Sequence, residues 1–150
     1  MRKVPVYYYS SVSNLTGRFA EHLAIADGRP VFNLADSAVR RREATGPWVL
    51  LTPSYKAGNA NEVTLPTPVR AFLRSPMNRR RLIGIIGSGN RNFGVYYQAA
   101  ARQLAQVSGR PVLFEFELSG TPEDVERCVE ILERLDEAVA AGAEGADQVR

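Results

Sequence analysis

The sequence has very few of the residues that usually carry disulfide or metal chemistry. Its 150 residues include one cysteine, Cys128, and one histidine, His22. A single cysteine excludes an internal disulfide and favours a reducing compartment. We find neither a metal-ligand spacing nor a nucleophile–base pair, so we expect no bound metal and no catalytic side chain. We expect Cys128 to pack in the core and His22 to be exposed on a helix.

Long apolar runs are also missing. No run approaches the roughly 20 residues that cross a membrane, and the amino terminus lacks a signal-peptide pattern. We therefore expect a cytoplasmic protein with no membrane partner. A length of 150 residues allows one domain, which we place at residues 1–138. Residues 139–150 are rich in alanine, glycine and polar residues, and we expect them to form a disordered tail.

Lysine is scarce too, because Lys3 and Lys56 are the only two. Arginine therefore supplies most of the positive charge in a formal net charge of +3. Two arginine triplets, at 40–42 and 79–81, could bind nucleic acid or an acidic protein. The second triplet directly precedes the apolar segment at Leu82, five residues separate the first from the one at Trp48, and no nucleic-acid-binding module accompanies them. We interpret them as solvated turns before strands and expect no nucleic-acid partner.

Apolar strands alternate with helical patterns along the chain. Strands are predicted at Val4–Tyr9, Pro30–Leu34, Trp48–Thr52, Leu82–Gly87 and Val112–Leu118. Helices are predicted at Thr16–Ile25, Pro66–Leu73, Val95–Val107 and from Thr121 onward. This alternation predicts an α/β fold with a five-stranded parallel sheet of order 2-1-3-4-5 and helices on both faces. Residues 35–47 are too short and too rich in arginine for a full helix, so one helix position should be reduced.

Three loops follow the first, third and fourth strands, so they should meet at one edge of the sheet. The first loop consists of Ser10, Ser11, Val12, Ser13, Asn14, Leu15 and Thr16. Hydroxyls and backbone N–H groups at a helix N-terminus suit a phosphate. Without glycine or lysine, the loop is neither a Walker loop nor a dinucleotide fingerprint, so a monophosphate fits best. The alternative is a plain Ser/Thr helix cap.

The second and third loops supply groups that can bind a planar ring. The second contains Thr52, Pro53, Ser54, Tyr55, Lys56, Ala57 and Gly58 and ends at Glu62, and the third consists of Ser88, Gly89, Asn90, Arg91, Asn92, Phe93 and Gly94. Asparagine amides and backbone groups can bind the edge of a heterocycle, and Phe93 can lie against its face. A phosphate site beside two such loops matches flavin mononucleotide (FMN). The alternative for the third loop is an ordinary surface loop.

Several segments resemble the NrdI family, the flavodoxin-like assembly proteins of class Ib ribonucleotide reductase. The resemblance covers about residues 4–135 and rests on Tyr9–Ser13, Pro53–Tyr55, Ser88–Gly94, Phe116–Thr121 and Glu123–Glu126. It implies non-covalently bound FMN that receives electrons from a reductase or small donor. It also implies reduction of molecular oxygen to a superoxide- or peroxide-level oxidant. The small, radical-bearing subunit of the reductase would receive that oxidant while its radical cofactor is assembled.

Two details depart from the family pattern. Relatives usually end the first loop with Asn-Thr, whereas here Leu15 precedes Thr16 and the asparagine is Asn14. The second loop of many relatives is rich in glycine, and here only Gly58 is left. These departures affect which groups contact the phosphate and the flavin N5 atom.

The charge of the loops favours an oxygen-reactive flavin. The third loop carries Arg91 and no carboxylate, and the second carries Lys56 against Glu62. A positive rim stabilises an anionic reduced flavin and attracts superoxide. Two alternatives stay open, a generic FMN electron carrier and a flavin-free binding module that kept the fold. Whether the protein is an oxygen-reducing assembly protein or a generic electron carrier, the flavin carries the chemistry.

Overall fold

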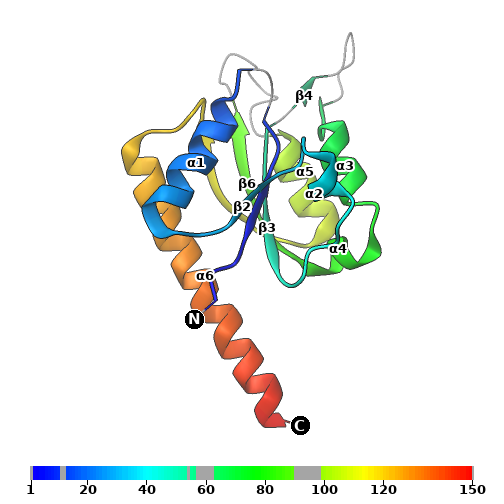
Figure 1. Cartoon of the computed structure of the whole chain (residues 1–150), viewed down its shortest axis with the longest axis vertical. Coiled ribbons are helices and arrows are strands. Elements are labelled where there is room, and N and C mark those ends of the chain that lie inside the picture. The colour runs from blue at the N-terminus through cyan, green and yellow to red at the C-terminus, as the bar shows by residue number, and fades with distance from the viewer. Residues whose placement is uncertain (1, 11–12, 54, 57–62, 90–98, 150) are drawn as a thin grey trace.

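A five-stranded parallel sheet forms the centre of the protein (Figure 1). The computed structural model describes residues 2–10, 13–53, 55–56, 63–89 and 99–149, with backbone only at 55–56, 63–64 and 143–149. The strands are β1 (Val6–Tyr8), β2 (Val31–Asn33), β3 (Trp48–Pro53), β6 (Leu82–Gly89) and β7 (Val112–Glu117). Their order, β2-β1-β3-β6-β7, confirms the predicted order 2-1-3-4-5.

Helices cover both faces of the sheet, as predicted (Figure 1). One face carries α1 (Leu15–Asp27) and α6 (Pro122–Val149), and the other carries α2 (Ser37–Arg40), α3 (Thr67–Phe72), α4 (Pro76–Arg81) and α5 (Ala99–Ser108). Each face has its own apolar cluster. Phe19 stacks on Phe116 in the first, with ring centroids 3.8 Å apart. In the second, the buried Trp48 donates its indole N–H to the carbonyl oxygen of Asn78 at 2.8 Å.

The crossover between β2 and β3 contains only α2, a helix of four residues. Asp36 caps it by accepting a hydrogen bond from the backbone N–H of Ala38 at 2.9 Å. The reduced helix position was predicted, because residues 35–47 lack the apolar stripe that a full helix would bury against the sheet.

The second arginine triplet is not a turn, contrary to the prediction. Arg79, Arg80 and Arg81 form the last turn of α4. Ser75 caps this helix by accepting a hydrogen bond from the backbone N–H of Asn78 at 3.3 Å, and Pro76 follows the cap. Basic side chains at the carboxyl end of a helix interact favourably with its dipole, which explains why three arginines are compatible with helix here.

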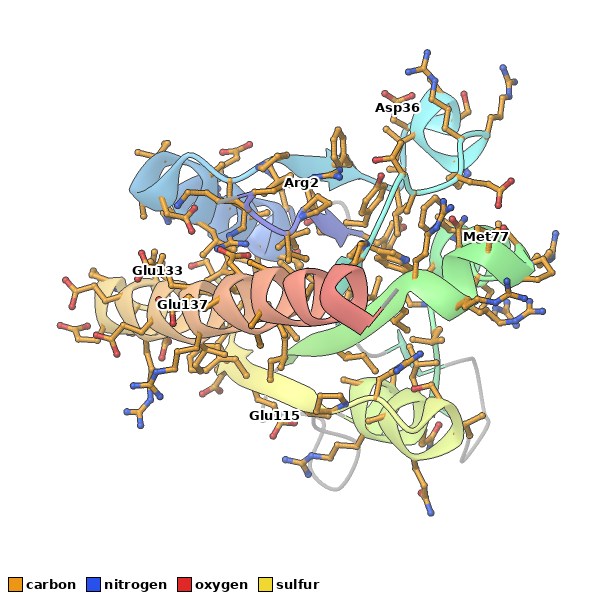
Figure 2. The ribbon with its side chains drawn as sticks, turned by 90° about the horizontal axis from the view of Figure 1, so that it is seen from below. Arg2, Asp36, Met77, Glu115, Glu133 and Glu137 are labelled. Atoms are coloured by element: carbon orange, nitrogen blue, oxygen red, sulfur yellow. The ribbon has the colours of Figure 1, made fainter. Side chains whose placement is uncertain are left out.

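The start and the inner face of α6 agree with the predictions made from the sequence. Thr121 and Asp124 form a capping box. The backbone N–H of Asp124 donates to Thr121 Oγ1 at 3.1 Å, and the backbone N–H of Thr121 donates to Asp124 Oδ2 at 2.9 Å. Cys128 is fully buried, and burial raises the pKa of its thiol to about 12. Glu133 and Glu137 lie on the exposed side (Figure 2). His22, on α1, is exposed as predicted.

The end of α6 differs from the expected disordered tail at 139–150, because the helix continues to Val149. Alanine and glutamate have high helix propensity, which allows helix without packing on the sheet. The last turns project beyond the sheet (Figure 1). The domain boundary at residue 138 stays a prediction. In the described part of the chain, no helix is both long and apolar enough to span a membrane.

Candidate functional site

The carboxyl ends of β1, β3 and β6 lie side by side at one edge of the sheet (Figure 1). Tyr8 of β1 pairs in register with Leu51 of β3, and Pro53 at the end of β3 pairs with Ser88 of β6. The three loops therefore start at neighbouring points, as the sequence predicted.

Three hydroxyl groups connect β1, α1 and β6 at this edge. Ser10 Oγ accepts a hydrogen bond from the backbone N–H of Gly17 at 2.9 Å. Thr16 Oγ1 and Ser88 Oγ lie 2.8 Å apart, and both residues are buried. We name Ser10, Thr16 and Ser88 the hydroxyl cluster. All three were predicted site residues, and the contact between Thr16 and Ser88 joins positions 72 residues apart in the sequence.

The hydroxyl cluster retains hydrogen-bond donors. Ser10 Oγ accepts from Gly17, and the described residues provide no acceptor for its own hydrogen. Only one hydroxyl of the Thr16–Ser88 pair donates to the other, so the accepting hydroxyl keeps its hydrogen for another partner. Leu15 and Thr16 begin α1, and the first N–H groups of a helix have no acceptor within the helix. Because these donors lie at the positive end of the helix dipole, an anionic oxygen complements them.

Asn14 forms the turn that leads into α1. Its backbone is left-handed, with φ 57° and ψ 26°, a conformation that asparagine adopts more readily than most residues. Its side chain makes no capping hydrogen bond and lies over Gly17, where an added Cβ would come within 2.0 Å of Asn14 Oδ1. Asn14 is thus the turn residue, and Leu15 presents the first helical N–H.

Gly17 was not among the predicted site residues. Its N–H fixes Ser10 Oγ, and its lack of a side chain leaves room for Asn14. The signal that could have identified it is a glycine directly after the Ser/Thr-rich loop at the start of a helix.

The other predicted site residues fall into two groups. Pro53 and Gly89 end their strands, Ser13 is exposed before α1, and the backbones of Tyr55 and Lys56 form β4 (Tyr55–Lys56), which pairs antiparallel with β5 (Val63–Thr64). Ser11, Ser54, Ala57, Gly58, Asn90, Arg91, Asn92, Phe93 and Gly94 lie outside the described residues, and their ring contacts stay predictions. Within the part of the chain that is described, no group of three or more His, Cys, Asp or Glu side chains could hold a metal ion.

Solved flavodoxins share this architecture. Flavodoxin 2 from Bacillus cereus matches with a TM-score of 0.53 at 16% identity, over 90% of this chain and 99% of that one. A mutant of the flavodoxin from Pseudomonas aeruginosa matches with a TM-score of 0.58 at 19% identity, over 89% of this chain and 97% of that one. At these identities the likeness shows a flavodoxin-like fold and nothing further.

Comparison with sequence relatives identifies the family, which the shared fold alone does not. A family model described as NrdI flavodoxin-like matches residues 6–130. Protein NrdI from Photorhabdus laumondii is 38% identical over 131 residues, which cover 87% of this chain and 91% of that protein. Protein NrdI from Escherichia coli is 41% identical over 119 residues, covering 79% of this chain and 84% of that protein. The chain therefore belongs to the NrdI flavodoxin-like family.

Proposed function

We propose that this protein binds one FMN at the carboxyl edge of its sheet and supplies an oxidant to the small subunit of class Ib ribonucleotide reductase. The oxidant is oxygen reduced to the superoxide or peroxide level, and it serves the assembly of the subunit's radical cofactor. The observation that carries the proposal is the hydroxyl cluster at the N-terminus of α1, in a chain that belongs to the NrdI flavodoxin-like family.

The donors at this edge fit a phosphate monoester. Ser10, one hydroxyl of the Thr16–Ser88 pair and the N–H groups of Leu15 and Thr16 offer hydrogens to one small region at the positive end of a helix. A phosphate dianion has oxygen acceptors for all of these donors. The loop lacks the glycines that let a backbone approach a pyrophosphate, which favours FMN over FAD.

The chain's part in the chemistry is to bind, orient and surround the flavin. Bound FMN would supply the transfer of electrons from a reductase or small donor to molecular oxygen. The hydroxyl cluster anchors the phosphate end. We assign the ring to the second and third loops, where Lys56 and Arg91 add positive charge. Positive charge there attracts an anionic oxidant and keeps it near the partner's entry point.

The same rim is the proposed docking surface for the small subunit. Lys56, Arg91 and Phe93 give it basic and aromatic character, so an acidic patch is the complementary surface on the partner. Docking there places the flavin next to the partner and shortens the path that the oxidant travels.

Radical assembly tests this proposal directly. The FMN-loaded protein is reduced anaerobically, mixed with a manganese-loaded class Ib small subunit and exposed to oxygen. Tyrosyl radical is then counted by electron paramagnetic resonance. We expect radical with this protein and none when it is omitted. An equal yield from an ordinary flavodoxin would support the generic electron carrier instead, and no radical with either protein would contradict the proposal.

A further inference from the structure

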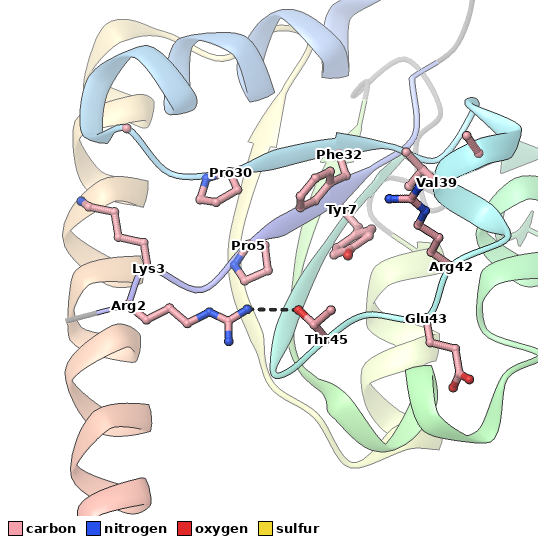
Figure 3. Close-up of a pocket in the computed structure, with 12 residues that line it drawn as sticks. Arg2, Lys3, Pro5, Tyr7, Pro30, Phe32, Val39, Arg42, Glu43 and Thr45 are labelled. Carbon is pink, nitrogen blue, oxygen red and sulfur yellow. Dashed lines mark hydrogen bonds between the residues drawn. The ribbon is translucent and has the colours of Figure 1, made fainter.

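A cavity of about 650 Å³ opens beside β1 and β2, where the short crossover leaves the sheet uncovered (Figure 3). Its lining comes from the amino-terminal segment, β1, residues 28–32 and residues 38–45. The described residues of the candidate flavin site are not part of this lining. Pockets for small molecules commonly measure about 300–1,000 Å³, so the volume suits one.

Two aromatic rings, Phe32 and Tyr7, belong to the apolar part of this crossover cavity. Phe32 of β2 is 38% exposed, an unusual position for a large apolar ring. Its centroid lies 4.9 Å from that of Tyr7 on β1. Tyr7 is also stacked on the buried Phe72, with centroids 4.9 Å apart, so the floor of the cavity is fixed to the core. A planar ligand ring can pack against Phe32 without displacing a core residue.

The hydroxyl of Tyr7 faces the cavity without a hydrogen-bond partner. Tyr7 is nine-tenths buried, and no described residue donates to or accepts from its hydroxyl. Figure 3 shows the hydroxyl directed into the space between Phe32 and Thr45. Burial raises the pKa of Tyr7, so the group is a neutral donor. Buried hydroxyls normally have a partner, and a ligand oxygen would provide one here.

The charged residues of the lining favour an anion. They are Arg2, Lys3, Arg42 and Glu43. Lys3 pairs with Asp27 at 3.8 Å, and Arg2 donates only to the neutral hydroxyl of Thr45 at 3.1 Å. Glu43 accepts a hydrogen bond from Ser75. The guanidinium of Arg42 has neither a hydrogen bond nor an ion pair within the described chain, and the cations of the lining outnumber its carboxylate, so the cavity carries an excess of positive charge.

We propose that the crossover cavity binds a small planar aromatic molecule that carries an anionic oxygen group. The ring packs on Phe32, and the carboxylate or phosphate oxygen accepts hydrogen bonds from the Tyr7 hydroxyl and the Arg42 guanidinium. The site lies away from the flavin edge and does not depend on the proposed function.

Three probes test this site by calorimetric titration of the full chain as purified. They are 2-naphthoate, adenosine 5′-monophosphate and the neutral 2-naphthamide. We expect at least one anionic probe to bind with a Kd below about 1 mM and more tightly than the amide. The tighter anion identifies a carboxylate or a phosphate ligand. Amide shifts measured by nuclear magnetic resonance should centre on Val6–Tyr8 and Val31–Asn33.

Matched variants locate the interaction. Arg42→Gln should raise the Kd of the anionic probe by about threefold to tenfold, and Phe32→Ala should weaken binding of the ring. Arg41→Gln removes the same charge from an exposed neighbour outside the lining and should leave the Kd unchanged. Equal effects of Arg42→Gln and Arg41→Gln, equal binding of the amide, or no anionic probe bound below 1 mM would overturn the proposal.

Discussion

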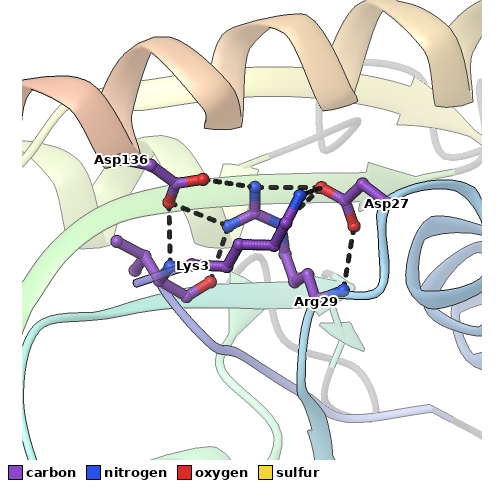
Figure 4. Close-up of polar contacts among 5 residues, drawn as sticks. Lys3, Asp27, Arg29 and Asp136 are labelled. Carbon is purple, nitrogen blue, oxygen red and sulfur yellow. Dashed lines mark hydrogen bonds and ion pairs between the residues drawn. The ribbon is translucent and has the colours of Figure 1, made fainter. Parts of the chain in front are cut away.

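The guanidinium of Arg29 and the carboxylate of Asp136 form a buried bidentate ion pair, with Nη2–Oδ2 and Nη1–Oδ1 distances of 2.9 and 3.1 Å (Figure 4). Asp27 adds a second carboxylate at 3.0 Å from Nε of Arg29. Val4 completes the group, since its N–H donates to Asp136 and its carbonyl oxygen accepts from Arg29. The group fastens the segment before β1 to the carboxyl end of α1 and to α6. Burial alone would lower the pKa of Arg29, but the two carboxylates hold it above its ordinary value.

Breaking this pair should destabilise the fold strongly. Asp136→Asn removes the bidentate partner of the buried Arg29 and leaves Asp27 as its remaining carboxylate, so we expect the free energy of unfolding to fall by about 3 kcal/mol, the lower end of the range for a broken buried pair. Glu115→Gln is the matched control, because it breaks the exposed pair with Arg102 and should cost less than about 1 kcal/mol. Urea unfolding measures both. Similar losses in the two variants would mean that the buried pair contributes no more than a surface pair.

The thiol of Cys128 should make stability fall in alkaline solution. Its pKa is raised from 9.0 to about 12 in the fold, so above pH 9 the unfolded state loses a proton that the folded state keeps. The contribution of the protonated thiol to the unfolding free energy is intact below pH 9 and is lost progressively between pH 9 and 12. From pH 8 to pH 10 the wild type should lose about 1.4 kcal/mol more than Cys128→Ala. Parallel pH profiles of the unfolding free energy in the two proteins would show that Cys128 does not cause the loss.

The hydroxyl cluster should contribute directly to FMN affinity. Ser10→Ala removes a donor and the acceptor of the Gly17 N–H, and we expect the Kd for FMN to rise by about fivefold to tenfold. Thr16→Val should act in the same direction. Ser37→Ala, an exposed serine on α2, is the control and should leave the Kd unchanged. Flavin fluorescence quenching measures each Kd, and an unaltered Kd in both cluster variants would move the phosphate elsewhere.

Docking on the reductase small subunit should depend on salt. If Lys56 and Arg91 face an acidic patch, raising the ionic strength should slow association more than it speeds dissociation. Removing both charges with Lys56→Gln and Arg91→Gln should flatten this dependence, whereas Arg127→Gln on the exposed side of α6 should not. Surface plasmon resonance at several salt concentrations gives both rates. Binding that ignores ionic strength would place the interface on another surface.

The end of α6 should contribute little to stability. Among the side chains of this helix that the structure describes, Val139 is the last to pack against the first apolar cluster. Removal of residues 141–150 should therefore change the unfolding free energy by less than about 1 kcal/mol, in line with a packed domain that ends near residue 138. Truncation before Leu132, which is fully buried, should unfold the protein. A large loss on removal of 141–150 would show that the last turns are part of the domain.

The sheet order could be predicted from the sequence because its strands are largely apolar segments, and helical patterns separate most of them. The capping box at Thr121 and Asp124 is equally local, since both partners lie within one turn. The two-residue strands β4 and β5 were missed, because such short pairs have no periodicity to detect.

Polar contacts between residues far apart in the chain could not be predicted from the sequence. Thr16 and Ser88 were each predicted as site residues, but only the fold shows that their hydroxyls meet. The burial of Arg29 could not be predicted from the sequence, because an arginine is ordinarily exposed. Its burial depends on two carboxylates that lie 2 and 107 residues away in the chain. The crossover cavity likewise arises from the short α2, whose consequence for Phe32 is visible only in three dimensions.

The flavin content of the purified protein is the most direct test of FMN binding. The protein is purified without added flavin, denatured, and the released cofactor is identified and counted by liquid chromatography against protein concentration. We expect a yellow protein that releases about one FMN per chain and no FAD, with no flavin left covalently attached. Recovery of FAD, or a colourless protein that does not bind added FMN, would contradict it.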